Sequence, residues 1–117
     1  MTTADKYILA IDLGTSGPKV ALVSVRGEVV ASAFEETPLL LFPNGGAEQR
    51  PDDWWNAVVK AARTVIGQNL GPVESIVALS CTSQYSCTVA VGRDGRPLMN
   101  AINLMDTRGE PYVRQIT

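Results

Sequence analysis

The chain has 117 residues, which is enough for one domain with a buried core. It is 45% apolar and 19% charged with a net charge of -2, so its composition gives no reason to expect nucleic acid or an anionic membrane as a partner. No stretch approaches the roughly 20 apolar residues that span a bilayer, and the first residues lack the layout of a signal peptide, so we expect a cytoplasmic protein.

The first third of the chain predicts three strands in an antiparallel meander. The apolar run 7–12 is typical of a buried strand and ends at Asp12, which it delivers into a turn. Two more strands are expected at 20–25 and 29–34. The Arg-Gly-Glu connection between them suits a hairpin, because Gly27 can adopt a positive φ.

The rest of the chain predicts helices alternating with strands. Two prolines and two glycines make 37–46 a loop, and a proline at 51 followed by two aspartates opens a helix that Gly67 or Gly71 ends. This order favours an α/β fold, a mixed sheet with helices on its faces. The remaining predicted elements are a strand at 73–79, a shorter strand at 88–91, and a helix from Thr107 with Asp106 as its N-cap. Because this predicted helix is cut off at Thr117, we expect the chain to be a fragment.

Two cysteines and the absence of histidine limit the chemistry of the segment. A zinc site normally needs four Cys or His ligands, so Cys81 and Cys87 cannot form one alone, and we expect them to be buried free thiols. Without histidine there is no Ser-His, Cys-His or His-metal mechanism. The available groups are carboxylates, hydroxyls, amides and cations.

A glycine-rich turn of sequence Asp-Leu-Gly-Thr-Ser-Gly-Pro-Lys joins the first two predicted strands. Glycines let backbone N–H groups approach a phosphate, so we expect Gly14, Thr15 and Ser16 to contact phosphate oxygens, with hydroxyls as further donors. Lys19 adds a positive charge, and Asp12 is placed to hold Mg²⁺ directly or through water. The alternative is a hairpin turn whose polar side chains only satisfy backbone groups, and the turn alone leaves both interpretations open.

The turn does not match a Walker A loop, because no Gly-Lys-Ser/Thr follows a glycine loop into a helix, and it does not match a Rossmann fingerprint, because a strand follows it. It resembles the first phosphate motif of the superfamily of actin, hexokinase and the heat-shock chaperone ATPases. Further blocks narrow the resemblance to the FGGY carbohydrate kinases, whose members include xylulokinase and glycerol kinase. These blocks lie at 46–55, 83–88, 94–98 and 101–108, and with the turn they cover nearly the whole chain.

The resemblance implies an actin-like ATPase (ribonuclease H-like) fold in two domains, with residues 1–117 as the N-terminal portion of the first. It implies a kinase that uses ATP and Mg²⁺ to phosphorylate a hydroxyl of a pentulose, polyol or related carbohydrate. In the family the catalytic base is an Asp well beyond Thr117, and the adenine pocket also lies further on. No catalytic residue is therefore assigned in this segment, and we expect the chain alone to be inactive.

The resemblance also implies a sugar site, whose candidates are Gln84, Tyr85, Ser86, Asp106 and Arg108. Xylulokinases commonly carry Gln-Met-His and glycerol kinases Gln-Arg-Glu at the first three positions, so the shorter Ser86 changes both reach and charge. We therefore expect a neutral polyhydroxy substrate other than xylulose or glycerol. A solvated or carboxylate-paired Arg108 remains an alternative, as does an Asp106 that only caps a helix.

Other positions depart from the family pattern. Leu104 stands where the family usually has Trp, and Met105 where it has Asn or Gln, which leaves a smaller apolar wall beside the expected sugar. Gly46 and Ala47 replace a common Trp-Val. The adjacent tryptophans at the start of the predicted helix are expected to pack in the core and on the helix face rather than against a sugar.

Two alternatives from other classes stay open. One is a non-catalytic nucleotide-binding module of the actin-like superfamily. The other is an acyl-CoA-linked ATPase activator, although that branch commonly binds an iron–sulfur cluster that two cysteines cannot hold alone. For a kinase the expected partner is a small-molecule sugar or polyol, with neither nucleic acid nor membrane, and self-association into a homo-oligomer is left open.

Overall fold

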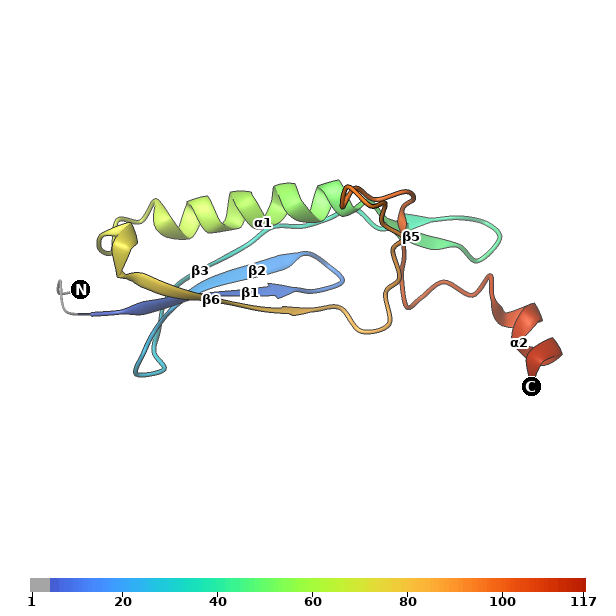
Figure 1. Ribbon diagram of the computed structural model, residues 1–117, viewed down its shortest axis with the longest axis horizontal. Helices are drawn as coiled ribbons and strands as arrows, with labels where there is room; N and C mark the ends of the chain where they lie inside the picture. The colour runs from blue at the N-terminus through green and yellow to red at the C-terminus, as the bar shows by residue number, and fades with distance from the viewer. Residues whose placement is uncertain (1–4) are drawn as a thin grey trace. The chain divides into compact units, whose positions relative to one another are not determined.

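The computed structural model describes residues 5–117, which form two compact units (Figure 1). Unit 1 combines the residues up to Thr37 with 54–84, and unit 2 combines 38–53 with 85–117. Among the described residues, no helix is both long enough and apolar enough to cross a bilayer.

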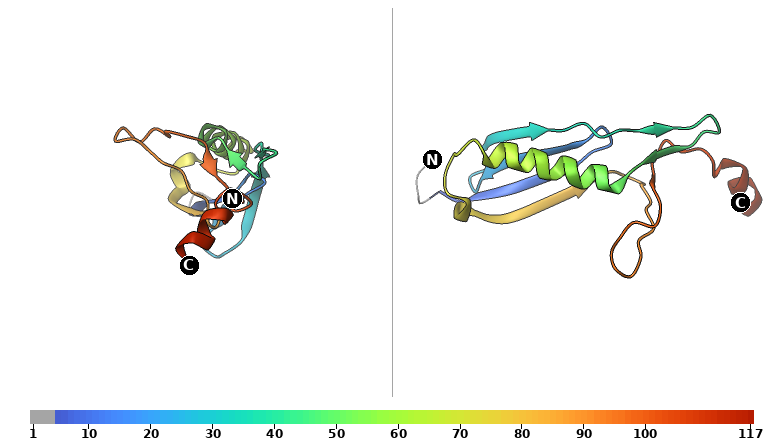
Figure 2. Two further views of the ribbon diagram at one scale, coloured as in Figure 1. Left: turned by 90° about the vertical axis from the view of Figure 1, so that its right-hand side faces the viewer. Right: turned by 90° about the horizontal axis from the view of Figure 1, so that it is seen from above.

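A four-stranded mixed sheet is the framework of unit 1 (Figure 2). Its strands are β1 (Tyr7–Leu13), β2 (Pro18–Ser24), β3 (Val29–Phe34) and β6 (Ile76–Ser83), in the order β3-β2-β1-β6. The first three strands pair antiparallel, and β6 runs parallel to β1. The predicted meander is therefore confirmed, and the return strand adds the parallel pairing that makes the sheet mixed.

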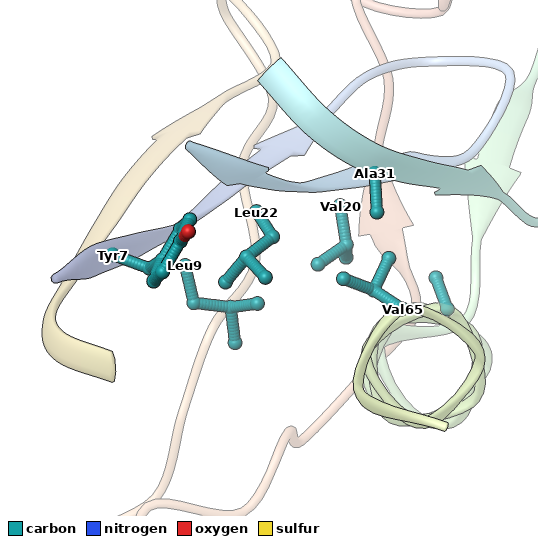
Figure 3. Close-up of a cluster of buried hydrophobic side chains, with 7 residues drawn as sticks. Tyr7, Leu9, Val20, Leu22, Ala31 and Val65 are labelled. Carbon is teal, nitrogen blue, oxygen red and sulfur yellow. The ribbon is translucent and has the colours of Figure 1, made fainter. Parts of the chain in front are cut away.

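Helix α1 (Pro51–Ile66) covers one face of this sheet (Figures 1 and 2). Its acidic first turn and its end just before the glycine at 67 match the predicted start and stop signals. Ala61 and Val65, four residues apart, are fully buried and pack with Val20 and Leu22, the alternate residues of β2 that point to the helix (Figure 3). Apolar residues four apart on the helix thus pack against alternate residues of the strand in one core.

Strand β6 is the least covered strand of the sheet. A 3-10 turn, η1 (Val73–Ser75), replaces the first part of the strand predicted at 73–79, because the Ser75 hydroxyl and N–H bond the carbonyl of Pro72. Every β6 residue after Ile76 is exposed, and the strand pairs on one side only within the described sheet.

Unit 2 is built around a small antiparallel sheet in the order β4-β5-β7. Its strands are β4 (Leu40–Leu41), β5 (Ala47–Gln49) and β7 (Ala101–Ile102), and a short helix, α2 (Glu110–Ile116), follows. The prediction that 37–46 is entirely loop was wrong, because β4 pairs with β5 across a turn closed by glycine.

Two further predictions in unit 2 were wrong. The strand predicted at 88–91 is only a pair of isolated bridges, Thr88 to Ile102 and Val91 to Pro97, around a tight turn. The helix predicted from Thr107 begins at Glu110 with Gly109 as its N-cap, so Asp106 does not cap it. The reason is that the Asp106 carboxylate bonds other groups, as described below.

Two burial predictions were also wrong. Cys81 is exposed because it lies on the uncovered strand β6, and Cys87 is only partly buried. Trp54 is half-buried, but Trp55 is 68% exposed because it lies outside the buried stripe of α1. An exposed tryptophan and an exposed thiol were not foreseen from residue type alone.

Candidate functional site

The glycine-rich turn joins β1 directly to β2, and its polar side chains reach solvent. The N–H of Gly17 donates to the carbonyl of Gly14 over 3.2 Å, which closes the turn. The antiparallel ladder places Asp12 directly opposite Lys19, and both are exposed, as are the two hydroxyl residues of the turn. The structure therefore brings a carboxylate, an ammonium group and two hydroxyls to one accessible turn.

This set of groups fits Mg²⁺ better than a metal that needs an all-protein cage. Within residues 5–117, no three Cys, Asp or Glu side chains gather as a metal site. Mg²⁺ commonly uses one or two carboxylates and completes its shell with water and substrate phosphates. Asp12 alone is consistent with that pattern.

The parallel pairing with β6 adds polar groups that the sequence reasoning did not assign. Asp12 pairs with Thr82 and Leu13 with Ser83, and both hydroxyl residues are exposed. Gln84 follows at once, so it leaves the sheet at the same edge as the turn. Carboxyl ends of neighbouring strands are where open α/β sheets usually bind ligands. The Ser-Cys-Thr-Ser run before the predicted sugar residues was the available signal.

The turn rests against the chain that follows β3, a support that no sequence pattern indicated. The N–H groups of Glu35 and Thr37 donate to the carbonyls of Pro18 and Ser16, each over 3.1 Å. Gly17 has φ +146°, and a side-chain carbon there would run into the backbone of Glu35. Only glycine allows this close approach.

The other predicted sugar residues begin unit 2. Tyr85 is 82% exposed, and Ser86 is exposed with a positive φ of 51°. A positive φ is uncommon for a residue with a Cβ and is often found at functional sites. Two residues on, Thr88 exchanges backbone hydrogen bonds of 2.9 and 2.7 Å with Ile102, which joins this segment to β7.

Asp106 and Arg108, also predicted as sugar residues, bind each other and Glu48. The Arg108 guanidinium donates from Nε and Nη2 to Asp106 Oδ2 over 2.9 and 2.6 Å, and from Nη2 to Glu48 Oε2 over 2.6 Å. The N–H of Ala47 donates to the same Asp106 oxygen over 2.8 Å. We call Glu48, Asp106 and Arg108 the carboxylate–arginine cluster. In the structure Arg108 is therefore paired with carboxylates, which is one of the alternatives that the sequence left open.

Neighbouring residues complete the surroundings of the cluster. The amide of Asn100 donates to Glu48 Oε1 over 3.0 Å. The guanidinium lies 6.0 Å from the centre of the Phe42 ring, at the outer limit for a cation–π contact. A Cβ at Gly46 would stand 3.0 Å from both the Arg108 guanidinium carbon and the Phe42 ring. Glycine at this position therefore leaves the room that Arg108 occupies.

The cluster shifts the acidity of its members. Hydrogen bonds from Arg108, and then from the Ala47 N–H, lower the pKa of Asp106 from 3.8 to about 2. The Asn100 amide and Arg108 lower the pKa of Glu48, and the two carboxylates raise the pKa of Arg108. All three groups are charged at neutral pH, so Asp106 is poorly suited to accept a proton there.

This pKa shift predicts a pH dependence of stability. Because the folded-state pKa of Asp106 lies below its unfolded value, the ion pair contributes stability above about pH 4 and loses it as the pH falls toward about 2. We expect Asp106→Asn to lower the free energy of unfolding at neutral pH. In this acid range the free energy of unfolding of the variant should fall less steeply with decreasing pH than that of the wild type. Urea unfolding at several pH values measures both effects, with the exposed Asp94→Asn as the control. Parallel pH curves for wild type and Asp106→Asn would contradict the prediction.

The chain matches the model of the N-terminal domain of the FGGY family of carbohydrate kinases over residues 7–117. With its mixed sheet and its antiparallel meander, the chain has the actin-like fold class of the FGGY kinases. The chain belongs to the FGGY family.

Individual relatives agree with this assignment. The chain is 33% identical to the xylulose kinase of Bacillus subtilis and 36% identical to the glycerol kinase of Paracidovorax citrulli, over 96% and 94% of its own length. The crystal structure of a gluconate kinase from Lactobacillus acidophilus superposes with a TM-score of 0.85 at 29% identity over 96% of the chain. The chain spans about a fifth of these relatives, 22% of each.

Proposed function

We propose that the protein containing this chain is an ATP-dependent sugar kinase that transfers the terminal phosphoryl group of MgATP to a hydroxyl of a pentulose, polyol or related carbohydrate. The observation that carries the proposal is the accessible turn, with Asp12 opposite Lys19, in a chain of the FGGY family. In this proposal the chain is the N-terminal portion of the first of two actin-like domains.

Each group of the turn has a part in this proposal. The N–H groups of Gly14, Thr15 and Ser16 and the ammonium of Lys19 bind phosphate oxygens. Asp12 holds Mg²⁺, directly or through water. When bound, MgATP supplies the phosphoryl group, and the turn contributes positioning and charge neutralisation, the main work in this chemistry.

The catalytic base is proposed to lie outside this chain. Asp106 is engaged by Arg108 and Ala47 and has a lowered pKa, which argues against it as a base. We accordingly expect the 117-residue chain alone to phosphorylate no sugar. Nucleotide binding without phosphorylation by the longer protein would instead favour the non-catalytic nucleotide-binding module.

The substrate proposal is that Gln84, Tyr85 and Ser86 contact a neutral polyhydroxy sugar other than xylulose or glycerol. The amide of Gln84 both donates and accepts hydrogen bonds, and Ser86 is too short to replace the His or Glu of the named relatives. We expect Gln84→Ala to raise the sugar KM about tenfold, because a sugar hydroxyl loses its partner. Ser86→Ala should change the order of preferred sugars.

The test is a panel of pentuloses, hexuloses, aldoses and polyols assayed with the full-length enzyme and both variants. Ser32→Ala, an exposed serine on β3, is the control and should leave every KM unchanged. Unchanged KM and selectivity in both site variants would remove this stretch from the sugar site. A wild type that prefers xylulose or glycerol would defeat the substrate proposal alone.

A further inference from the structure

The face of α1 that points away from the sheet carries an open groove of about 680 Å³ (Figure 1). The side chains that line it all come from the helix, and they are Trp55, Asn56, Val59, Lys60, Arg63 and Thr64. The groove is therefore distinct from the stripe of α1 that packs on the sheet, whose buried residues are Ala57, Ala61 and Val65.

Three of the lining residues form a row along the helix. Trp55, Val59 and Arg63 are four residues apart, so they follow one another on one side of α1, almost opposite its buried stripe. Trp55 is 68% exposed and Arg63 is exposed, whereas Val59 between them is half-buried. Among the described residues, the Arg63 side chain has no ion-pair or hydrogen-bond partner. An accessible aromatic ring and an unpaired guanidinium thus lie one helical turn to either side of a small apolar residue.

This row is complementary to itself. Rows of residues four apart are ridges along which two helices commonly pack against each other. When a second α1 lies antiparallel against the first, with a two-fold axis at Val59, Trp55 of one copy meets the partner's Arg63. The same contact forms again at the other end, because a two-fold axis produces every contact twice. A guanidinium over a tryptophan ring is a favourable cation–π pair, and the two valines meet at the centre.

Lys60, which lies next to this axis, does not oppose the pairing. A two-fold axis at Val59 brings the two copies of Lys60 near each other, and unpaired ammonium groups there would repel. In each copy, however, Lys60 Nζ lies 3.1 Å from Glu35 Oε2, so a carboxylate already offsets its charge. The cation that stays without a counterpart on this face is Arg63, and the second copy offers it the ring of Trp55.

We propose that the row Trp55–Val59–Arg63 is a self-association surface, on which a second copy of the protein docks antiparallel about a two-fold axis. A second copy is the occupant that presents both a ring to the guanidinium and a guanidinium to the ring. The inference goes beyond the proposed kinase function and does not depend on it. A contact along one 16-residue helix is smaller than a standard protein interface, so we expect a weak, reversible dimer with a dissociation constant in the micromolar range.

Sedimentation velocity of the full-length protein at a series of concentrations tests the proposal. We expect monomer and dimer in exchange. Trp55→Ala and Arg63→Glu should each raise the dissociation constant about tenfold or more, because every substitution removes two symmetric contacts of an aromatic or arginine anchor. Arg93→Glu makes the same change of charge at an exposed arginine in the hairpin turn of unit 2, and this control should leave the dissociation constant unchanged.

Val59→Cys tests the axis itself. In a background that carries Cys81→Ser and Cys87→Ala, the introduced thiols of the two copies lie beside the axis, within reach of a disulfide. We expect mild oxidation to cross-link this variant into a covalent dimer. Thr64→Cys in the same background places an exposed thiol more than a helical turn from the axis, and it should cross-link much less.

Two results overturn the inference. One is a full-length protein that stays monomeric at every concentration. If Trp55→Ala then also lowers the free energy of unfolding, another part of the longer protein occupies the groove. The other is a dimer whose dissociation constant neither Trp55→Ala nor Arg63→Glu changes, because such a dimer forms through a different surface. None of these measurements uses a sugar or ATP, so their outcome is separate from that of the proposed function.

Discussion

Asp12→Asn in the full-length protein is expected to lower kcat on the order of a hundredfold or more, with little change in folding stability. The carboxylate is exposed at the end of a paired strand, so the fold does not depend on its charge. Its proposed work is to organise Mg²⁺ at the transferred phosphate, where a neutral amide is a poor ligand. Steady-state kinetics at saturating sugar and MgATP, with a thermal melt of each protein, measures the two effects separately.

The matched control is Asp94→Asn. Asp94 is an exposed aspartate of the hairpin turn in unit 2, where its Oδ1 accepts the N–H of Arg96 over 3.0 Å, a bond that asparagine also makes. We expect normal kcat from this variant. Near-normal kcat from Asp12→Asn would show that Asp12 is only a turn residue and would remove the proposed metal ligand.

Gly17→Ala is expected to destabilise the chain by roughly 3 kcal/mol or more. The added methyl meets the backbone of Glu35, which cannot move aside as a flexible side chain would, and φ at this position is +146°. The N–H of Thr37, which bonds Ser16, ties the same two segments together. Urea unfolding followed by circular dichroism gives the change in free energy.

Gly27→Ala separates strain from steric clash. Gly27 also has a positive φ, +91°, but no atom lies within 4 Å of an added Cβ. We expect this variant to lower the free energy of unfolding by only about 1–2 kcal/mol, which is the cost of placing alanine in this backbone conformation. Equal losses in the two variants would show that the close approach at Gly17 has no energetic consequence.

The parts of the fold that the sequence predicted are those with a local cause. Short apolar runs bounded by turn residues predicted β1–β3, and a proline, two aspartates and apolar residues at helical spacing predicted α1. The turn with Asp12 and Lys19 could also be predicted from local sequence, because its glycines and polar residues directly follow a predicted strand.

The parts that sequence reasoning missed depend on partners far away in the chain. Strand β4 has two residues and exists only because it pairs with β5. Glu48 and Arg108 are 60 positions apart, and no periodicity connects them. Asp106 was assigned to the nearest helix, whereas its strongest partners are a guanidinium and the N–H of Ala47, 59 positions away. Pairwise contacts of this kind leave no local pattern.

The uncovered strand β6 has a consequence for how the chain folds as it is synthesised. The meander β1–β3 pairs neighbours in sequence and can form early, whereas β6 joins β1 across more than 60 intervening residues. Within residues 5–117 no strand pairs with the outer side of β6. Val77 and Leu79, at 55% and 64% exposure, are apolar side chains on an unpaired edge, the arrangement that invites strand addition from a second chain. A strand paired with the outer side of β6 would cover this edge.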